Sequence, residues 1–357
     1  MLILSALLVS QPAFAVPIPV GDDASLDVGG LVQTQAVVTE AGAPDGTSAG
    51  LDLFVRRARL VVNGTLGKHW AFTFVTDSPN LGKGGDWTGR ILVQDALVSA
   101  KVARELTVDT GLILLPFGHH GMQSAGTLGT LDYHSAELLY PLNTTQTWRD
   151  VGFQLRGLAF KDRLHYRVGV FNGLEGGPAI PDTDQGTTNP KDAPRLAGQL
   201  RVNVLGVEDR MYLGGIYFAD KPMLSIGASG IVQPDAVGSG ADLAPWVGLN
   251  GDVFADVPIG KNQELIAQAA VVHYAAGEGA ATSGTGGWVE LGYRIGLVEP
   301  VVSAETFASD AEAADSRAYK FGVNTWIKRH TANVKAEVAI TQLGDLAVAP
   351  EGITGTL

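Results

Sequence analysis

RLAGQLRVNV, the segment at residues 195–204, alternates between polar and apolar positions. Successive side chains of an extended chain point to opposite faces, so this pattern predicts a β-strand with one polar and one apolar face. The same alternation recurs at residues 164–170, 289–297 and 334–340, whereas apolar residues at helical spacing are hard to find. The chain is therefore predicted to be all-β. The apolar face of the first segment carries Leu196, Gly198, Leu200, Val202 and Val204.

Two architectures produce such strands, a two-sheet sandwich and a membrane barrel. Two features of the segments favour the barrel. They are long enough to cross a bilayer at a tilt, which takes about 9–11 residues. Their apolar faces also carry many Gly and Ala beside Val and Leu, which suits contact with lipid better than a tightly packed core. We therefore expect an antiparallel transmembrane β-barrel, with an exported soluble β-sandwich binding protein as the alternative.

The connections between the expected strands alternate between short and long, as they do in outer-membrane barrels. Residues 65–68 and 161–162 make short connections, for example, while 78–89 and 173–194 make long ones. The exception is 205–222, a long connection where a short one belongs, which we expect to hold an irregular piece or a short extra strand. The fifteen expected strands lie near residues 25–38, 51–64, 69–77, 90–102, 105–116, 147–160, 163–172, 195–204, 223–233, 246–257, 263–275, 287–297, 299–308, 317–328 and 333–343.

A closed bacterial barrel of this kind has an even number of strands, so about sixteen are expected. The last residues, 351–357, are too short for a full strand and lack the terminal aromatic residue that is usual in such barrels. The N-terminal segment also lacks the expected basic residues. We therefore expect both chain ends to be incomplete, and the closing strand to be weak or missing.

The composition excludes several classes of protein. There are 37 acidic and 25 basic residues, for a net charge of −12, so no cationic surface is available for nucleic acid. The sequence has no Cys, which excludes disulfides, thiol nucleophiles and zinc ribbons. It has neither a Gly-x-Ser-x-Gly elbow nor a His-Glu-x-x-His motif, and the adjacent His134 and Ser135 cannot pair as base and nucleophile in an extended segment. We expect no enzyme activity, no metal site, no cofactor and no nucleic-acid partner.

The first fifteen residues have the features of an export signal. Met1 to Ser10 is nearly all apolar, and Ala13-Phe14-Ala15 is a small-x-small cleavage pattern. Residues 1–15 are therefore predicted to be a signal peptide, with 16–357 as a single barrel domain; a buried N-terminal strand is the alternative. No later run of 18 apolar residues exists, so no transmembrane helix is expected. Export and barrel together predict the outer membrane of a Gram-negative cell.

Several short motifs, in order along the chain, resemble the phosphate-selective porins, the O/P porin family. They are Phe54-Val55-Arg56-Arg57-Ala58-Arg59-Leu60, Gln94-Asp95-Ala96, Pro116-Phe117-Gly118, Ser124, Trp148-Arg149-Asp150-Val151-Gly152 and Phe321-Gly322-Val323-Asn324. The resemblance implies a trimeric outer-membrane porin, embedded in lipid, that passes small hydrophilic solutes by passive diffusion. It also implies a preference for small anions such as phosphate or polyphosphate. A general porin without specificity is the alternative.

The resemblance implies that an arginine cluster lines an anion-binding constriction. Strict alternation points Arg57 and Arg59 into the lumen and assigns Phe54, Ala58, Leu60 and Val62 to the lipid face. A charge at mid-bilayer on the lipid face costs about 2–4 kcal/mol, which favours the lumen for these arginines. Arg56 falls on the lipid face, where it either snorkels or is turned inward by a bulge. The alternative is that the three arginines only fix the depth of the strand.

The long segment 117–146 follows the fifth strand, where trimeric porins fold a loop into the barrel. Its tip carries His119, His120 and Ser124, in place of the cationic side chains of the family, and the two histidines are expected to be solvated. Asp132 and Glu137 give the loop negative charge. Asp95 resembles the family's acidic partner at the site, or else forms an ordinary salt bridge to a wall arginine. Further lumen-wall residues are expected at Lys101, Arg156, Arg167 and Arg201.

Overall fold

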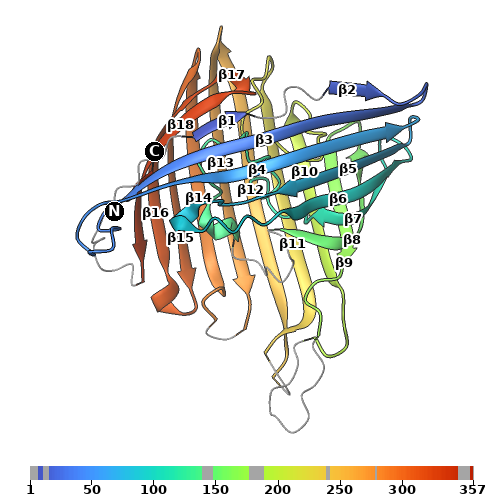
Figure 1. Ribbon diagram of the computed structural model, residues 1–357. Helices are drawn as coiled ribbons and strands as arrows, with labels where there is room; N and C mark the ends of the chain where they lie inside the picture. The colour runs from blue at the N-terminus through green and yellow to red at the C-terminus, as the bar shows by residue number, and fades with distance from the viewer. Residues whose placement is uncertain are drawn as a thin grey trace.

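The structure is a computed structural model that describes residues 7–10, 16–138, 148–176, 189–238, 242–277, 280–344 and 354–356. One antiparallel sheet contains all of the long strands, and strands that follow one another in sequence pair with one another (Figure 1). The long strands are β3 (Ala24–Thr39), β4 (Gly50–Leu66), β5 (Trp70–Asp77), β6 (Leu92–Lys101), β7 (Thr107–Leu114), β8 (Arg149–Ala159), β9 (Leu164–Phe171), β10 (Arg195–Leu205), β11 (Met223–Val237), β12 (Ala244–Gly260), β13 (Gln263–Ala275), β14 (Gly284–Ile295), β15 (Val298–Ser309), β16 (Ser316–Thr325) and β18 (Asn333–Leu343).

All fifteen expected strands are present, which confirms the barrel fold and excludes a two-sheet sandwich. In Figure 1 the strands β3 to β8 run crosswise to β11 to β16, as the opposite walls of a barrel with tilted strands do. Short elements complete the chain: β1 (Leu7–Ser10), β2 (Val16–Pro19), β17 (Ile327–His330), β19 (Thr354–Thr356) and the 3-10 turns η1 (Lys83–Gly85), η2 (Ser135–Leu138) and η3 (Glu312–Ala314).

The first and last long strands, β3 and β18, do not pair directly within the described residues. The short strands β1 and β19 each pair with both of them. β1 lies in the predicted signal peptide, of which residues 1–6 and 11–15 fall outside the described part of the chain. Along that described part, no long sixteenth strand follows β18, where we expected a weak or missing one.

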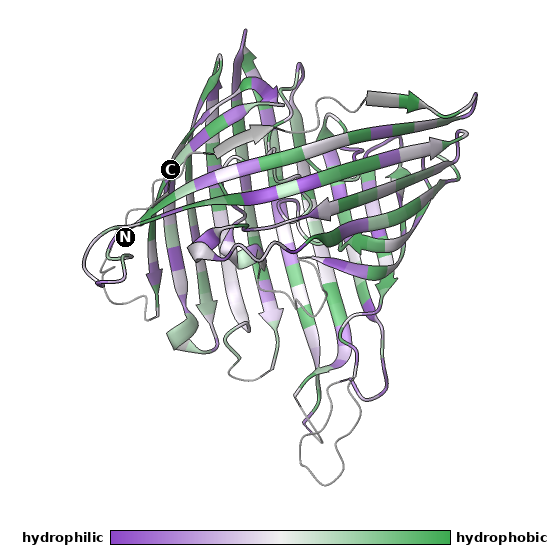
Figure 2. Ribbon diagram, viewed as in Figure 1, coloured by the Kyte–Doolittle hydropathy of each residue, from purple (hydrophilic) through white to green (hydrophobic). Residues whose placement is uncertain are grey.

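The barrel buries its polar face and exposes its apolar face. On β10, Arg195 and Arg201 are fully buried while Leu196 and Leu200 are about half exposed. β14 repeats the pattern: Val289 is 52% exposed, and its neighbours Trp288 and Glu290 are 4% and 2% exposed. Figure 2 shows the resulting alternation of hydrophilic and hydrophobic bands along the strands. A water-facing barrel would have the opposite arrangement, so the outer surface fits lipid and the polar residues line the interior.

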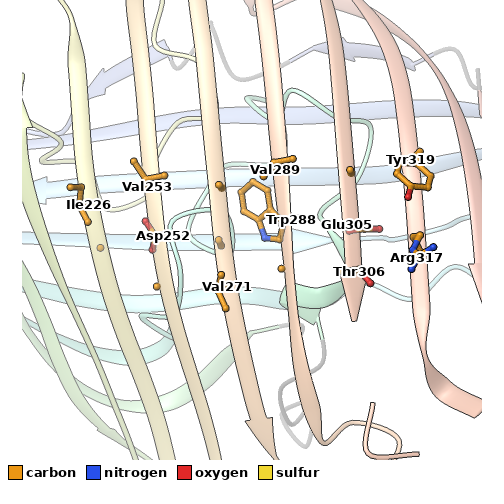
Figure 3. Close-up of a pocket in the computed structure, with 16 residues that line it drawn as sticks. Ile226, Asp252, Val253, Val271, Trp288, Val289, Glu305, Thr306, Arg317 and Tyr319 are labelled. Carbon is orange, nitrogen blue, oxygen red and sulfur yellow. The ribbon is translucent and has the colours of Figure 1, made fainter. Parts of the chain in front are cut away.

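A depression of about 900 Å³ is lined by residues of β11 to β16. Gly251 on β12 is one of them, and a side chain added there would meet open space. Val253, Val271 and Val289 surround it on the outer face (Figure 3). The lining also includes the buried Trp288 on β14. Within the described residues, no helix is long and apolar enough to cross a bilayer.

Two irregular segments fill the lumen. The first is 117–138, the described part of the predicted inward-folded loop 117–146; residues 139–147 lie outside the description. It contacts inward-facing groups on both walls, from Arg57 on β4 to Glu305 on β15. At its start, Gly118 has a φ of 63°, and an added Cβ would come within 2.6 Å of Glu137, so only glycine fits this turn. We refer to residues 117–138 as the plug.

The second interior segment is 206–222, which breaks the expected alternation of connection lengths. It is irregular and contains buried residues such as Leu213 and Ile216. Leu213 pairs with the plug through two backbone hydrogen bonds, to Met122 and from Ser124. The plug leaves β7 at the end of the barrel that has long loops, and 206–222 leaves β10 at the end that has short turns. The two segments therefore meet inside the barrel from opposite ends.

Candidate functional site

A β-bulge in β4 places two adjacent arginines on the lumen side. Gln33 of β3 faces Arg57, and the next residue, Thr34, faces Val55, so Arg56 is the extra residue. A bulge changes which face the following side chains occupy. Arg56 and Arg57 therefore both point inward, which corresponds to the second of the two alternatives for Arg56. The bulge also makes the expected position of Phe54 wrong: this ring is 6% exposed, on the opposite face from the exposed Leu51 and Leu53.

The plug supplies a carboxylate to both arginines. Arg56 donates to both carboxylate oxygens of Asp132 over 2.9–3.2 Å, and Arg57 donates to Oδ1 over 2.9 Å. Asp132 is the more accessible partner, with a side chain 39% exposed against 5% for Arg57. Burial raises the pKa of Asp132, but the two guanidinium groups outweigh this effect and bring the pKa to about 2. The carboxylate is thus ionised at neutral pH.

Further hydrogen bonds join the cluster to the wall and to the loop after β5. Arg57 donates to Gln33 Oε1 over 2.6 Å, and Arg56 donates to Asn80 Oδ1 over 3.0 Å. Arg59, one inward position along β4, donates to Asp77 Oδ2 over 2.9 Å. We call Arg56, Arg57 and Arg59 the arginine cluster. Three guanidinium groups share two carboxylates here, which leaves one positive charge in excess.

His134 attaches the plug to the wall opposite the arginine cluster. Its Nδ1 lies 3.1 Å from Glu305 Oε2, and its Nε2 lies 3.2 Å from Glu290 Oε2. A neutral imidazole has only one N–H, so donation to two carboxylates requires the imidazolium form. Burial lowers the pKa of His134, but its hydrogen bonds to the two glutamates outweigh burial and raise the pKa above 6.5. The ring also stacks on Trp288, with centroids 4.3 Å apart.

The two loop histidines are buried, which contradicts the expectation that they are solvated. His119 stacks on Phe254 and bonds to Glu208 of the second interior segment over 2.8 Å. His120 accepts a 3.0 Å bond from the backbone N–H of His134 and packs on Trp288. Burial lowers the pKa of His120 well below 6.5, so this ring is neutral. Sequence reasoning missed these positions because the partners are distant in the chain.

Asp95 faces the lumen, as expected, and pairs with a wall arginine. Arg149 of β8 donates to it over 3.1 Å and 3.4 Å. This contact corresponds to the second alternative for Asp95, a salt bridge to an arginine of the barrel wall. Ser124 lies in the plug, where its backbone N–H bonds to Leu213 and its carbonyl accepts the hydroxyl of Thr127. These contacts bind Asp95 to β8 and Ser124 to the second interior segment and to the plug itself.

The four expected lumen-wall residues have different surroundings. Arg156 pairs with Asp109 over 2.7 Å, and the buried Arg167 donates to the carbonyl of Arg210 over 2.8 Å. Arg201 is also fully buried and pairs with Asp252. Lys101 is exposed at the end of β6, beside a cavity of about 370 Å³ that Arg156 also lines.

Charges in the lumen are unevenly distributed between the two halves of the wall. Basic residues dominate on β4 and on β8 to β10. Among the described buried charged side chains from β13 to β18, five are glutamates and one, Lys335, is basic. Two of the glutamates hold the plug: Glu337 accepts the N–H of Leu131, and Glu305 accepts that of Ser135. The buried acidic residues on those strands are Glu264, Glu290, Glu299, Glu305 and Glu337.

Comparison with known proteins gives one family. Residues 31–207 match the family described as phosphate-selective porin O and P. No curated protein matches the sequence. The family match contains the whole arginine cluster and the plug, and it confirms the resemblance seen in the motifs up to Gly152; the motif Phe321-Gly322-Val323-Asn324 lies outside the matched residues.

Solved outer-membrane channels share the fold at low sequence identity. Salmonella typhi OmpF, solved with daunomycin, is 12% identical, with a TM-score of 0.57 over 91% of this chain and 99% of its own. An anion-selective porin from Comamonas acidovorans is 15% identical, with a TM-score of 0.55 over 94% of both chains. The outer membrane channel DcaP of Acinetobacter baumannii is 10% identical, with a TM-score of 0.53 over 91% of this chain and 99% of its own.

Proposed function

We propose that this protein is an outer-membrane porin that passes small anions, because residues 31–207 match the phosphate-selective porin family and its fold is shared with solved outer-membrane porins. The proposed solutes are phosphate or polyphosphate, which diffuse passively through the lumen and bind at the arginine cluster. The matched family and the fold both favour a channel over an enzyme.

The observation that carries the proposal is the excess positive charge of the arginine cluster. Three guanidinium groups on β4 face two carboxylates, Asp77 and Asp132. Guanidinium groups bind phosphate through paired, charge-assisted hydrogen bonds. A narrow, low-dielectric lumen strengthens that attraction relative to open water. The Comamonas neighbour is named as an anion-selective porin, which is consistent with an anion pathway through this fold.

The rest of the proposal concerns export and assembly. We propose that residues 1–15 are removed as a signal peptide and that the mature chain forms a homotrimer in outer-membrane lipid. In this proposal His119, Asp95 and Ser124 support the plug and its surroundings, through contacts with Glu208, Arg149 and Leu213 respectively.

A general porin is the second candidate, and the acidic wall favours it. The glutamates of β13 to β18 oppose anion accumulation, and Asp132 neutralises part of the arginine cluster. In that case small hydrophilic solutes would pass without selection for charge.

The reversal potential in planar bilayers under a KCl gradient distinguishes the two candidates. Anion selectivity, together with a chloride current that phosphate blocks, is the expected result. A cation-selective or non-selective channel that phosphate does not block would contradict the phosphate proposal and favour the general porin.

A further inference from the structure

The proposed anion site already contains an anion. The carboxylate of Asp132 contacts Arg56 and Arg57 with distances that suit any oxyanion, 2.9–3.2 Å. Its side chain is 39% exposed, whereas Arg57 beneath it is almost fully buried. A solute that reaches the cluster from the lumen therefore meets the carboxylate before it meets Arg57.

We propose that Asp132 is an exchangeable internal counter-ion, which a passing anion must displace to reach Arg56 and Arg57. This inference rests on the proposed function, because it takes the arginine cluster as the anion site. Passage is then an exchange of one anion for another at the same two guanidinium groups. The carboxylate returns when the solute leaves, so the cluster is never without a negative partner.

The plug holds Asp132 in a position where only its side chain needs to move. One residue before it, the N–H of Leu131 bonds to Glu337 over 3.1 Å. Two residues after it, His134 binds Glu290 and Glu305. Both anchors lie on β14, β15 and β18 and not on β4. Rotation of the Asp132 side chain therefore releases the guanidinium groups without moving the plug backbone.

Exchange favours multivalent oxyanions over monovalent ions. Chloride carries the same single charge as the carboxylate and cannot form a bidentate pair, so displacing Asp132 gains it little. Phosphate, polyphosphate or sulfate brings more charge and several acceptor oxygens, which contact both guanidinium groups and repel the carboxylate. Asp132 thus sets a threshold that multivalent oxyanions cross more readily than chloride. The preference for multivalent oxyanions over chloride would then depend on the competing carboxylate of Asp132 as much as on the arginines.

The test compares Asp132→Asn with the parent protein in planar bilayers. Removing the charge should make chloride relatively more permeant and lower the phosphate-to-chloride discrimination several-fold. Asp132→Glu keeps the competitor and should retain most of the discrimination. Asp22→Asn is the matched control, because it removes one charge from an exposed position between β2 and β3 and should leave discrimination unchanged. Heat-modifiable gel mobility reports whether each variant is folded.

The parent protein provides a second test that needs no variant. Sulfate should reproduce the phosphate block of the chloride current, and nitrate should not. If phosphate blocks the parent but nitrate blocks as well, or if discrimination is the same in Asp132→Asn, the exchange inference is overturned while the anion site stands. If neither the parent nor Asp132→Asn is anion-selective or blocked by phosphate, the proposed function fails, and the inference fails with it.

Discussion

Arg57 donates a 2.9 Å hydrogen bond to Asp132, a residue 75 positions further along the chain. The contact joins the barrel wall to the plug, and Arg56, the neighbour of Arg57, binds the same carboxylate. The charge that the lumen presents to a solute therefore depends on both residues. Several measurable consequences follow from this pair and from the groups that hold it.

Replacing Arg57 by Gln should reduce the preference for anions and weaken phosphate block, because one of the two guanidinium groups under Asp132 is lost. Arg56 still binds the carboxylate, so the plug should keep its position. Removing one partner of a buried ion pair can lower the free energy of unfolding by about 3–5 kcal/mol. Because Arg56 still binds Asp132, we expect a loss of about 3 kcal/mol or less. Reversal potential and phosphate titration of single-channel current measure the effect.

Arg90→Gln is the matched control for this substitution, since Arg90 is exposed in the loop between η1 and β6. Arg201 serves less well, because it is buried against Asp252 and its loss would disturb the wall itself. Equal selectivity in the Arg57 variant and the parent would mean that the arginine only anchors β4.

The attachment of the plug should weaken as pH rises. The pKa of His134 is raised above 6.5, so its contribution is complete below pH 6.5 and is lost as pH rises through the folded-state value. Lys320 on β16 also lies near the ring and opposes its charge, and the neutral ring of His120 packs beside it. We expect current noise from plug motion to increase between pH 6 and pH 9. His134→Gln should be noisy at both values; a parent channel with no such change would contradict the imidazolium assignment.

Selectivity set by Asp132 should persist into acid. Its pKa is lowered to about 2 from an ordinary 3.8, so the ion pair is complete above pH 3.8 and is lost only as pH falls through about 2. Phosphate-to-chloride discrimination should therefore change little on account of this residue between pH 8 and pH 4.5. A chloride-versus-sulfate comparison is the suitable measurement, because sulfate keeps its charge over this range. A loss of discrimination near pH 5 would show that Asp132 is not held by the arginines.

A charge on the outer face should destabilise the barrel. Val289 lies in the middle of β14 and is half exposed to the outer surface. Val289→Arg should cost about 2–4 kcal/mol if the position lies near the bilayer midplane. Val289→Ala keeps the surface apolar and should have a much smaller effect. Urea unfolding in lipid vesicles, followed by gel mobility, measures both; equal stability of the two variants would contradict a lipid-facing surface.

The sequence predicts the strands well because each strand carries its own signal. A residue on β10 or β14 faces lipid or lumen according to its parity, so alternation identifies the strand without any knowledge of its neighbours. The alternation of short and long connections then predicts the order of the strands in the sheet, since long strands that follow one another in sequence also pair with one another. The family resemblance added the location of the arginine cluster.

The parts that sequence reasoning missed depend on distant contacts. Phe54 was assigned to the wrong face because the bulge at Arg56 shifts parity by one residue and has no local signature. His119 and His120 are polar residues in a Gly-rich loop, which is typical of a solvated segment. Their burial comes from contacts with distant residues. His119 contacts Glu208, 89 positions further along the chain, and Phe254, and His120 packs on Trp288.

The bonds between Leu213 and the plug also constrain the order in which the molecule assembles. The two interior segments enter from opposite ends of the barrel, and each leaves the wall between strands that are far from the β3–β18 seam. Because both segments are enclosed by the finished wall, we expect their pairing to form while the sheet is still open and the seam to join last. Disrupting the Leu213 contact should slow folding into vesicles more than it changes the finished channel.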